Sequence, residues 1–327
     1  MNHLAERIFQ SKVTNFDELC LEVFQFQFLH NTVYQTYCGL LGINAVEQVT
    51  SINQIPFLPI EFFKTHSIKA FVGPEQKIFY SSATGGNGQS KHYINNLSLY
   101  EQSFLQAFQA YFGSVKDKCF LGLLPSYLER EGSSLIYMVQ HLMQESGNPL
   151  NGFFLYEHQT LYNRITQLEN IGKPYFIFGV SFALLDFAQA FPMKLVHGQV
   201  IETGGMKGRK KEITKLELYK ELSEAFETNT IFSEYGMTEL LSQAYASMDG
   251  KYQTPPWMKV EVVDPNDPLS LVQNNKTGLL RIIDLANLYS CSFIQSSDLG
   301  KQHPNNTFEV LGRLDNSDLR GCSLLVN

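Results

Sequence analysis

The stretch Ser81-Ser82-Ala83-Thr84-Gly85-Gly86-Asn87-Gly88-Gln89-Ser90-Lys91 combines small hydroxylated residues, three glycines and one lysine. Glycines let backbone N–H groups approach a polyphosphate closely, hydroxyls add donors, and the lysine adds a positive charge. The flanking runs Lys77-Ile78-Phe79-Tyr80 and His92-Tyr93-Ile94 predict two strands, so the stretch is expected at the tip of a hairpin. It matches neither a Walker A loop nor a dinucleotide-binding glycine motif. Two interpretations remain open, a phosphate-gripping loop and a solvated hairpin without a ligand.

The composition is that of a globular chain that must hold any anionic ligand locally. Hydrophobic residues make up 44% of the 327 residues, the net charge is −7, and the isoelectric point is near 5.6. This acidity argues against a nucleic-acid partner. No apolar run approaches the ~18 residues of a membrane span, and the N-terminus lacks the pattern of a signal peptide. We therefore expect a cytoplasmic protein without a membrane span.

The cysteines and histidines indicate no structural metal and no disulfide framework. The five cysteines are odd in number, scattered and without Cys-x-x-Cys spacing, and the eight histidines do not cluster. Most of the cysteines are expected to be small core residues. They are Cys20, Cys38, Cys119, Cys291 and Cys322.

Hydrophobic spacing predicts helices at the start of the chain and alternating helices and strands in the middle. Apolar positions at helical spacing between residues 3 and 42 predict a helical cap over residues 1–54. Two pairs with capping-box spacing, Ser98 with Glu101 and Thr214 with Glu217, predict helix starts. Short apolar runs predict strands at 120–124, 175–180, 195–201 and 230–232.

This alternation predicts an α/β fold with substantial parallel pairing over residues 55–252, whose ligands collect where the strands end. Four further strands, at 259–263, 278–284, 291–294 and 308–311, are separated by Pro, Asn and Asp turns. They predict a mostly β subdomain over residues 253–311. Cap, core and subdomain together make one large domain, residues 1–311.

Two glycine-containing segments are expected at strand ends of the α/β core. Gly204 and Gly205 offer a flat backbone surface that can carry a planar base, or they form an ordinary turn between strand and helix. In the segment 232–239, Tyr235 could stack near a base and Glu239 could hold Mg²⁺ on phosphates. The alternative there is that Thr238 caps a helix with Glu239 in its first turn.

A third segment lies in the β subdomain. Asp298, within Ser296-Ser297-Asp298-Leu299-Gly300, could accept hydrogen bonds from both hydroxyls of a ribose. Arg313, within Gly312-Arg313-Leu314-Asp315, could reach ribose or phosphate through its guanidinium. Each segment is alternatively a surface turn.

In this order, the glycine loop, the Gly-Gly pair, Tyr-Gly-x-Thr-Glu, Ser-Asp-Leu-Gly and Gly-Arg-x-Asp resemble the adenylate-forming superfamily. This superfamily contains acyl-CoA synthetases, luciferases and peptide-synthetase adenylation domains, and the resemblance covers roughly residues 55 to 322. Within it the chain is most similar to the LuxE acyl-protein synthetases. That similarity lies in Pro56-Phe57-Leu58-Pro59 with Phe63-Lys64, and in the segment 312–322.

The resemblance implies the large N-terminal domain of the adenylate-forming fold, followed by a hinge and a short C-terminal remnant at 312–327. The small C-terminal domain of the superfamily is expected to be largely absent, and its adenylation lysine has no counterpart. Two departures concern the loop: Ala83 stands where the superfamily usually has glycine, and Gly86 follows Gly85 where many members have Thr-Gly.

The resemblance also implies ATP and Mg²⁺ as cofactors and assigns residue roles. The phosphate loop would be Ser81, Ser82, Thr84, Gly85, Gly86 and Lys91. Gly204 and Gly205 would flank the adenine, and Tyr235 would stack on it. Thr238 and Glu239 would handle phosphate and magnesium. Asp298 would bind the ribose, Arg313 would assist, and Asp315 would be the hinge.

The implied activity is that of an acyl-protein synthetase. ATP would activate a fatty or other carboxylic acid to an acyl-adenylate, and the acyl group would pass to the thiol of Cys322 and then to an acyl-reductase partner. The neighbouring Arg320 could lower the pKa of this thiol. Alternatively, Cys322 is a small residue in a terminal strand. A phenylacetate-type acyl-CoA ligase and a non-catalytic nucleotide-binding scaffold of an acyl-reductase complex remain alternative functions.

Overall fold

The computed structural model describes residues 2–10, 15–81, 88–124, 132–204 and 213–314. The chain divides into two compact units. One is continuous, Val72–Pro255, and is called the α/β unit below. The other joins Met1–Phe71 to Pro256–Asn327 and is called the cap/β unit.

The α/β unit contains a six-stranded sheet whose order is β5-β4-β6-β7-β8-β9. All neighbouring pairs are parallel except β8 with β9. Strands β4 and β6 are buried along their whole length, which explains their continuous apolar runs. The bounds are β4 Cys119–Leu123, β5 Gly152–Phe154, β6 Tyr175–Gly179, β7 Gly198–Glu202, β8 Ile231–Tyr235 and β9 Ala244–Ala246.

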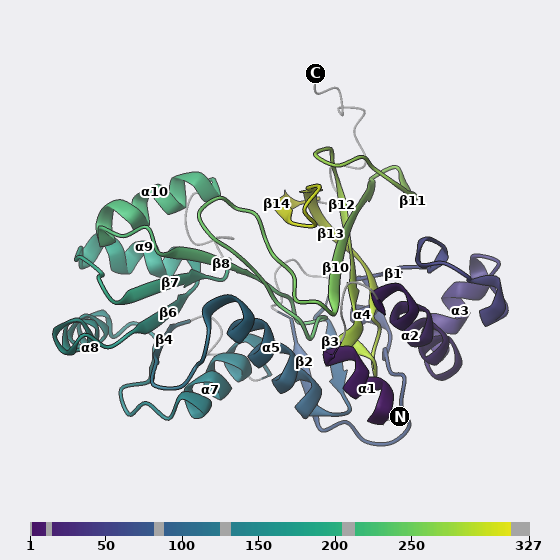
Figure 1. The fold of residues 1–327 in the computed structure, drawn as a ribbon, viewed down its shortest axis with the longest axis horizontal. Helices are drawn as coiled ribbons and strands as arrows, with labels where there is room; N and C mark the ends of the chain where they lie inside the picture. The colour runs from purple at the N-terminus through teal and green to yellow at the C-terminus, as the bar shows by residue number, and fades with distance from the viewer. Residues whose placement is uncertain (1, 11–14, 82–87, 125–131, 205–212, 315–327) are drawn as a thin grey trace. The chain divides into compact units, whose positions relative to one another are not determined.

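Helices cover both faces of this sheet. Figure 1 shows α5 (Leu97–Phe112) and α7 (Ser134–Ser146) on one face, and α9 (Ser181–Ala190) and α10 (Lys215–Phe226) on the other. Helix α8 spans His158–Ile171, and a separate hairpin pairs β2 (Lys77–Tyr80) with β3 (Lys91–Ile94).

An aromatic cluster fills the space between α5 and the sheet. Phe108 of α5 lies 5.1 Å from Phe176 of β6 and 5.6 Å from Phe120 of β4, between ring centroids. Phe112 packs edge-to-face on Phe176 at 5.2 Å. These rings are core residues that fix α5 on the sheet.

The cap/β unit is built on a second sheet of order β1-β13-β12-β10-β11, with β14 paired to β13. Apart from the parallel pair of β1 with β13, its strands are antiparallel. The strands are β1 Leu58–Pro59, β10 Met258–Asp264, β11 Asp267–Leu271, β12 Thr277–Asp284, β13 Phe293–Gln302 and β14 Phe308–Arg313. The helices are α1 Asn2–Phe9, α2 Phe16–His30, α3 Thr32–Leu40 and α4 Phe62–Thr65, with short 3₁₀ turns at Val46–Gln48, Ile52–Gln54 and Leu285–Asn287.

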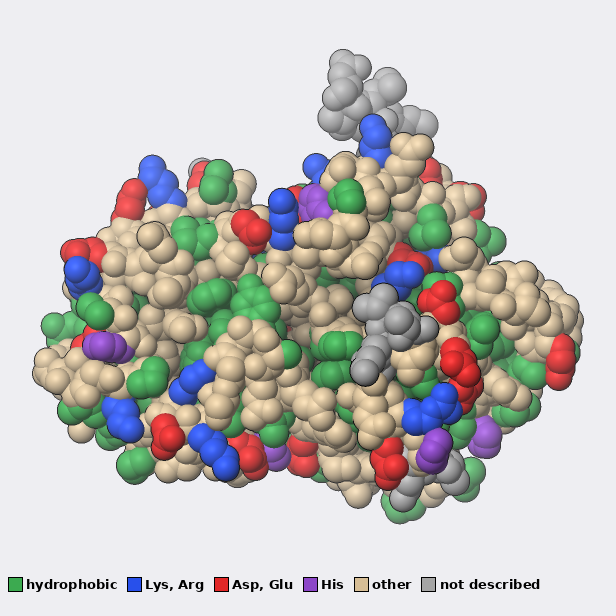
Figure 2. Space-filling view, viewed as in Figure 1, with side chains coloured by type: hydrophobic (Ala, Val, Ile, Leu, Met, Phe, Trp, Pro, Cys, Tyr) green, Lys and Arg blue, Asp and Glu red, His purple; other side chains and the backbone are tan. Residues whose placement is uncertain are grey.

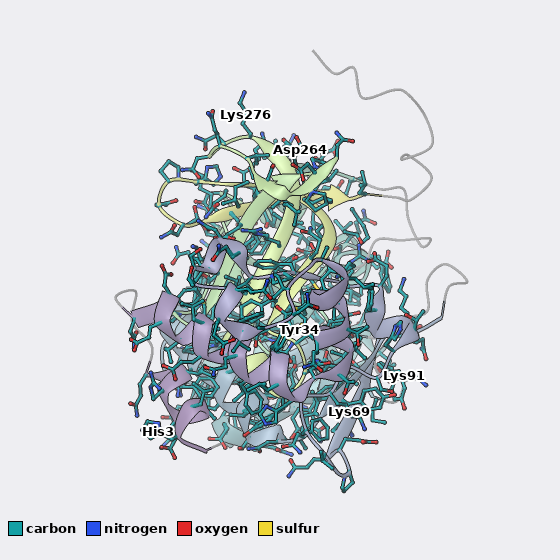
Figure 3. All side chains as sticks on the ribbon, turned by 90° about the vertical axis from the view of Figure 1, so that its right-hand side faces the viewer. His3, Tyr34, Lys69, Lys91, Asp264 and Lys276 are labelled. Atoms are coloured by element: carbon teal, nitrogen blue, oxygen red, sulfur yellow. The ribbon has the colours of Figure 1, made fainter. Side chains whose placement is uncertain are left out.

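The cap helices pack on this second sheet. Buried Gln27 of α2 donates to the carbonyls of Asn287 and Leu288, at 3.1 and 2.9 Å. Tyr34 of α3 stacks on Phe293 of β13 at 6.2 Å, and its hydroxyl donates to the carbonyl of Pro56 at 2.7 Å. Figure 3 shows Tyr34 among the helices that lie in front of the strands.

The fold class predicted from the sequence is confirmed, since a largely parallel α/β region is followed by a mostly antiparallel one. The compact units differ from the expected subdivision, because the cap and the β-rich region form one unit around a shared core. The predicted capping box of Ser98 and Glu101 is wrong. Asn96 caps α5 by accepting from the Ser98 N–H at 3.0 Å, and Glu101 instead accepts from the Tyr137 hydroxyl at 2.5 Å.

Two other local predictions have different outcomes. The capping box of Thr214 and Glu217 is confirmed at the start of α10. The run predicted as a strand from 195 begins only at Gly198, because the N–H of Leu195 bonds instead to the carbonyl of Phe226 at 3.0 Å.

On the molecular face drawn in Figure 2, Lys and Arg side chains are interspersed with Asp and Glu. Within the described residues, no helix is both long enough and apolar enough to cross a bilayer.

Candidate active site

The glycine-rich stretch follows β2 and leads into β3, as the sequence predicts. Tyr80 and Lys91 are paired across the hairpin. Beyond this pair the Ser81 hydroxyl accepts from the Ser90 N–H at 2.9 Å, and the Ser81 N–H donates to the Ser90 carbonyl at 3.1 Å. Lys91 is exposed at the edge of the hairpin (Figure 3). Four predicted loop residues lie outside the described part of the chain: Ser82, Thr84, Gly85 and Gly86.

His92 connects this hairpin to the segment after β8. Its side chain is fully buried, and its Nδ1 lies 2.7 Å from the carbonyl oxygen of Thr238. A carbonyl only accepts, so Nδ1 carries the proton and donates. Lys91 directly precedes His92 in β3, so it is next to the residue that ties the hairpin to Thr238. The role of His92 was not predicted; the alternation of exposed and buried side chains in β3 was the available signal.

The carboxyl end of β8 carries the predicted aromatic ring and carboxylate. Tyr235 is 8% exposed and packs edge-to-face on Tyr252 at 5.8 Å. Residues 237–240 form a turn closed by the Leu240 N–H, which donates to the Met237 carbonyl at 3.1 Å. The alternative prediction, in which Thr238 caps a helix with Glu239 in its first turn, is therefore wrong.

Glu239 is buried, with 5% of its surface exposed, in the turn that follows β8. Glu239 has a carboxylate and the preceding Thr238 a hydroxyl. Both are hard oxygen donors of the kind that Mg²⁺ prefers, and Mg²⁺ takes its remaining ligands from phosphates and water. The residues present therefore fit a magnesium ion bound together with a nucleotide.

Gly204 lies at the carboxyl end of the neighbouring strand β7, as predicted. Its φ of +80° is in the left-handed region, and apart from its chain neighbours no described residue has an atom within 4 Å of the position that a Cβ would take. The backbone therefore presents an open face there. Gly205 lies outside the described residues.

In the cap/β unit, the predicted site residues Asp298 and Arg313 contact each other. They are register partners on β13 and β14, and Arg313 Nε donates to Asp298 Oδ1 at 3.1 Å. Asp298 is 6% exposed. The alternative, in which these segments are surface turns, is wrong for both residues, because they lie within paired strands. Asp315 lies outside the described residues.

Comparison with protein families identifies the chain. The family model of acyl-protein synthetase LuxE matches residues 132–327, which is more than half of the 327 residues. The chain belongs to the LuxE family. No curated protein matches it.

Solved structures with the same fold are adenylate-forming enzymes. For a 2-hydroxyisobutyryl-CoA ligase in its postadenylation state the TM-score is 0.69 at 10% identity, covering 95% of this LuxE chain and 70% of the ligase. For ATP-bound MatB from Rhodopseudomonas palustris the TM-score is 0.55 at 16% identity, covering 74% of the LuxE chain and 49% of MatB. For the luciferase-like enzyme of the mealworm Zophobas morio the TM-score is 0.51 at 14% identity, covering 75% of the LuxE chain and 59% of that enzyme.

These identities establish the fold alone. The LuxE chain spans about half the length of the MatB structures that it matches. Its structure has the architecture expected for the large domain of adenylate-forming enzymes.

The cysteines of the LuxE chain separate into two groups. Four are buried: Cys20, Cys38, Cys119 and Cys291. Burial raises the pKa of Cys38, Cys119 and Cys291 to about 12, and it also raises that of Cys20. These four thiols are therefore poor nucleophiles, because the thiolate is the reactive form. Cys322 lies outside the described residues.

Proposed function

We propose that this chain is an ATP-dependent acid-activating enzyme. It converts a fatty or other carboxylic acid to an acyl-adenylate and then transfers the acyl group to a protein thiol, that of Cys322. The observation that supports the first step most directly is the bond from His92 to the carbonyl of Thr238. It joins the glycine-rich hairpin to the segment that carries Tyr235 and Glu239. In the proposed site the hairpin contacts the phosphates of ATP, and this segment contacts its base and its magnesium ion.

In the first step, a carboxylate oxygen of the acid attacks the α-phosphorus of ATP. A new P–O bond forms as the bond to pyrophosphate breaks, and the electron pair leaves with pyrophosphate. Catalysis of phosphoryl chemistry of this kind is mainly positioning and charge stabilisation. Lys91 supplies a positive charge and Ser81 a hydroxyl, while Tyr235 and Gly204 hold the base. A magnesium ion held by Glu239 would neutralise phosphate charge.

In the second step, the thiolate of Cys322 attacks the acyl carbon and AMP leaves with the electron pair of the broken C–O bond. This assignment is supported by the burial of the other four cysteines and their raised pKa values. The family further supports an acyl-reductase as the partner that accepts the acyl group. A cytoplasmic location stays a prediction.

Exchange of labelled pyrophosphate into ATP tests the first step. Exchange should depend on an added fatty acid and should fall about 10²-fold or more in Lys91→Ala and in Glu239→Ala, the usual effect of removing a charge-stabilising group. Lys77→Ala is the matched control, since Lys77 is an exposed lysine at the other end of the same hairpin. Absence of acid-dependent exchange in the wild type with every carboxylate tested would defeat the assignment.

Acyl labelling tests the second step and separates it from the runner-up. A hydroxylamine-labile label should form on the wild type and be lost in Cys322→Ser, with pyrophosphate exchange retained. A phenylacetate-type acyl-CoA ligase would instead transfer the acyl group to free CoA. This runner-up is kept because one structural neighbour is a ligase solved with CoA.

A further inference from the structure

Glu202 is a buried carboxylate that the proposed chemistry does not use directly. It is the last residue of β7 and only 1% exposed. Its Oε1 accepts from the Gly204 N–H at 2.5 Å and from the Ser181 hydroxyl at 2.6 Å. Its Oε2 accepts from the Ser233 hydroxyl at 2.8 Å. A carboxylate buried this deeply is costly unless such bonds satisfy it, so its position requires a reason.

These bonds join three neighbouring strand ends. Ser181 follows β6 and begins α9, Gly204 follows β7, and Ser233 lies on β8 (Figure 1). The Ser181 N–H in turn donates to the Gly204 carbonyl at 3.0 Å, and the Thr203 N–H donates to the carbonyl of Gly179 at 3.0 Å. Both sides of the Gly204 peptide are thus fixed to the sheet, one of them by Glu202.

The charge of Glu202 is offset by Lys215, the first residue of α10. Lys215 Nζ lies 3.8 Å from Glu202 Oε2 and 3.3 Å from the Ser233 hydroxyl, and it also contacts the Tyr252 hydroxyl. The two oxygens of Glu202 therefore have different tasks. Oε1 faces the turn at Gly204, and Oε2 faces the ammonium group.

We propose that Glu202 is a positioning residue for the nucleotide. By accepting from the Gly204 N–H, it holds the open left-handed glycine face on which the adenine of ATP lies. This inference rests on the proposed function, because that function supplies the ATP.

The chain offers a control in Glu169 of α8, whose carboxylate bonds to the backbone that precedes β7. Its Oε1 accepts from the Tyr175 hydroxyl at 2.7 Å and from the N–H groups of Val196 and His197, at 3.0 and 3.1 Å. Glu169 thus also takes three hydrogen bonds and also fixes backbone next to β7. These bonds lie at the amino end of β7, whereas Gly204 follows its carboxyl end.

The test is direct ATP binding, measured by titration calorimetry on the full-length protein without an acid substrate. Glu202→Ala should weaken the Kd for ATP about tenfold or more, equivalent to ~1.4 kcal/mol. Glu169→Ala should leave it within about twofold, because its lost bonds do not reach the glycine face. Equal Kd values for the two alanine variants would overturn the proposal.

Two conservative variants separate reach from charge and keep the test decisive if Glu202→Ala does not fold. Glu202→Gln keeps an oxygen at the same distance from Gly204 but loses the charge, so ATP binding should be retained. Glu202→Asp keeps the charge opposite Lys215 but is one methylene shorter, so ATP binding should weaken. The reverse order would show that charge pairing with Lys215, and not the hold on Gly204, is what matters.

The outcome is separable from that of the proposed function. A wild type that binds ATP but shows no acid-dependent pyrophosphate exchange would defeat the proposed function and leave the role of Glu202 standing. A wild type that binds no ATP would overturn both.

Discussion

At the scale of single residues, Glu234 shows how a strand end can hold a carboxyl in its neutral form. It faces Tyr245 across β8 and β9, and a Cβ on Gly236 would lie 2.3 Å from its Oε1, so the side chain folds back over that glycine. Burial raises the pKa of Glu234 from 4.5 to about 8. The negative charge of Glu202 adds to the increase and Lys215 opposes it.

This raised pKa predicts a specific pH dependence of stability. The folded state holds a proton that the unfolded state releases above its pKa of 4.5. The contribution is therefore complete below that value and is lost as the pH rises towards about 8, at up to ~1.4 kcal/mol per pH unit. Glu234→Gln is neutral at every pH and should remove this part of the decline. Urea unfolding at a series of pH values between these limits measures the difference.

The exposed carboxylate of Glu224 on α10 provides the control, since Glu224→Gln should give a curve parallel to the wild type. A wild-type curve parallel to that of Glu234→Gln would contradict the assignment of a retained proton to Glu234.

At the scale of elements, one long-range hydrogen bond ties the β2–β3 hairpin to the segment that follows β8. Because His92 Nδ1 donates to the Thr238 carbonyl at 2.7 Å, His92→Ala should leave that carbonyl without this donor and loosen the hairpin from the segment with Glu239. We expect pyrophosphate exchange to fall about tenfold, the equivalent of ~1.4 kcal/mol. His92→Asn, which can place an amide N–H near the position of Nδ1, should recover most of the rate. Equal losses in both variants would show that the bond itself is not required.

The elements also show what a sequence can and cannot predict. Four strands of the parallel sheet, β4, β6, β7 and β8, were predicted from apolar runs, and such a run is continuous where a strand is buried on both faces, as at Tyr175–Gly179. The three-residue strand β5 (Gly152–Phe154) was not predicted. Gly204 was placed correctly because the apolar run of β7 ends just before it. A surface turn remained open for Asp298 because aspartate and glycine are frequent turn residues. The pairing of β13 with β12 and β14 places Asp298 in a strand instead.

The supporting residues His92 and Glu202 were not predictable as functional. His92 bonds to a residue 146 positions away, and Glu202 to one 31 positions away. Spacing along the chain carries no information about bonds of this kind. The motif residues could be found from local sequence, but the residues that hold them in place could not.

At the scale of the whole molecule, the predicted ATP contacts are divided between the two compact units. The hairpin, Gly204 and Tyr235 belong to the α/β unit, whereas Asp298 and Arg313 belong to the cap/β unit. If a single nucleotide contacts both groups, ATP with Mg²⁺ should slow amide hydrogen exchange in two places. These are residues 202–204 and 235–239 of one unit, and residues 296–300 of the other.

The exposed strand β11 (Asp267–Leu271) supplies an internal control, since its exchange should not change. The ribose assignment makes the prediction sharper. A 2′,3′-dideoxy analogue of ATP lacks the hydroxyls that Asp298 would bind, so it should protect residues 202–204 and 235–239 but not 296–300. Asp298→Ala should give the same pattern with ATP itself. Protection by ATP confined to the α/β unit would rule out Asp298 as the sugar anchor, and equal protection of 296–300 by both nucleotides would assign that segment to a contact other than the ribose hydroxyls.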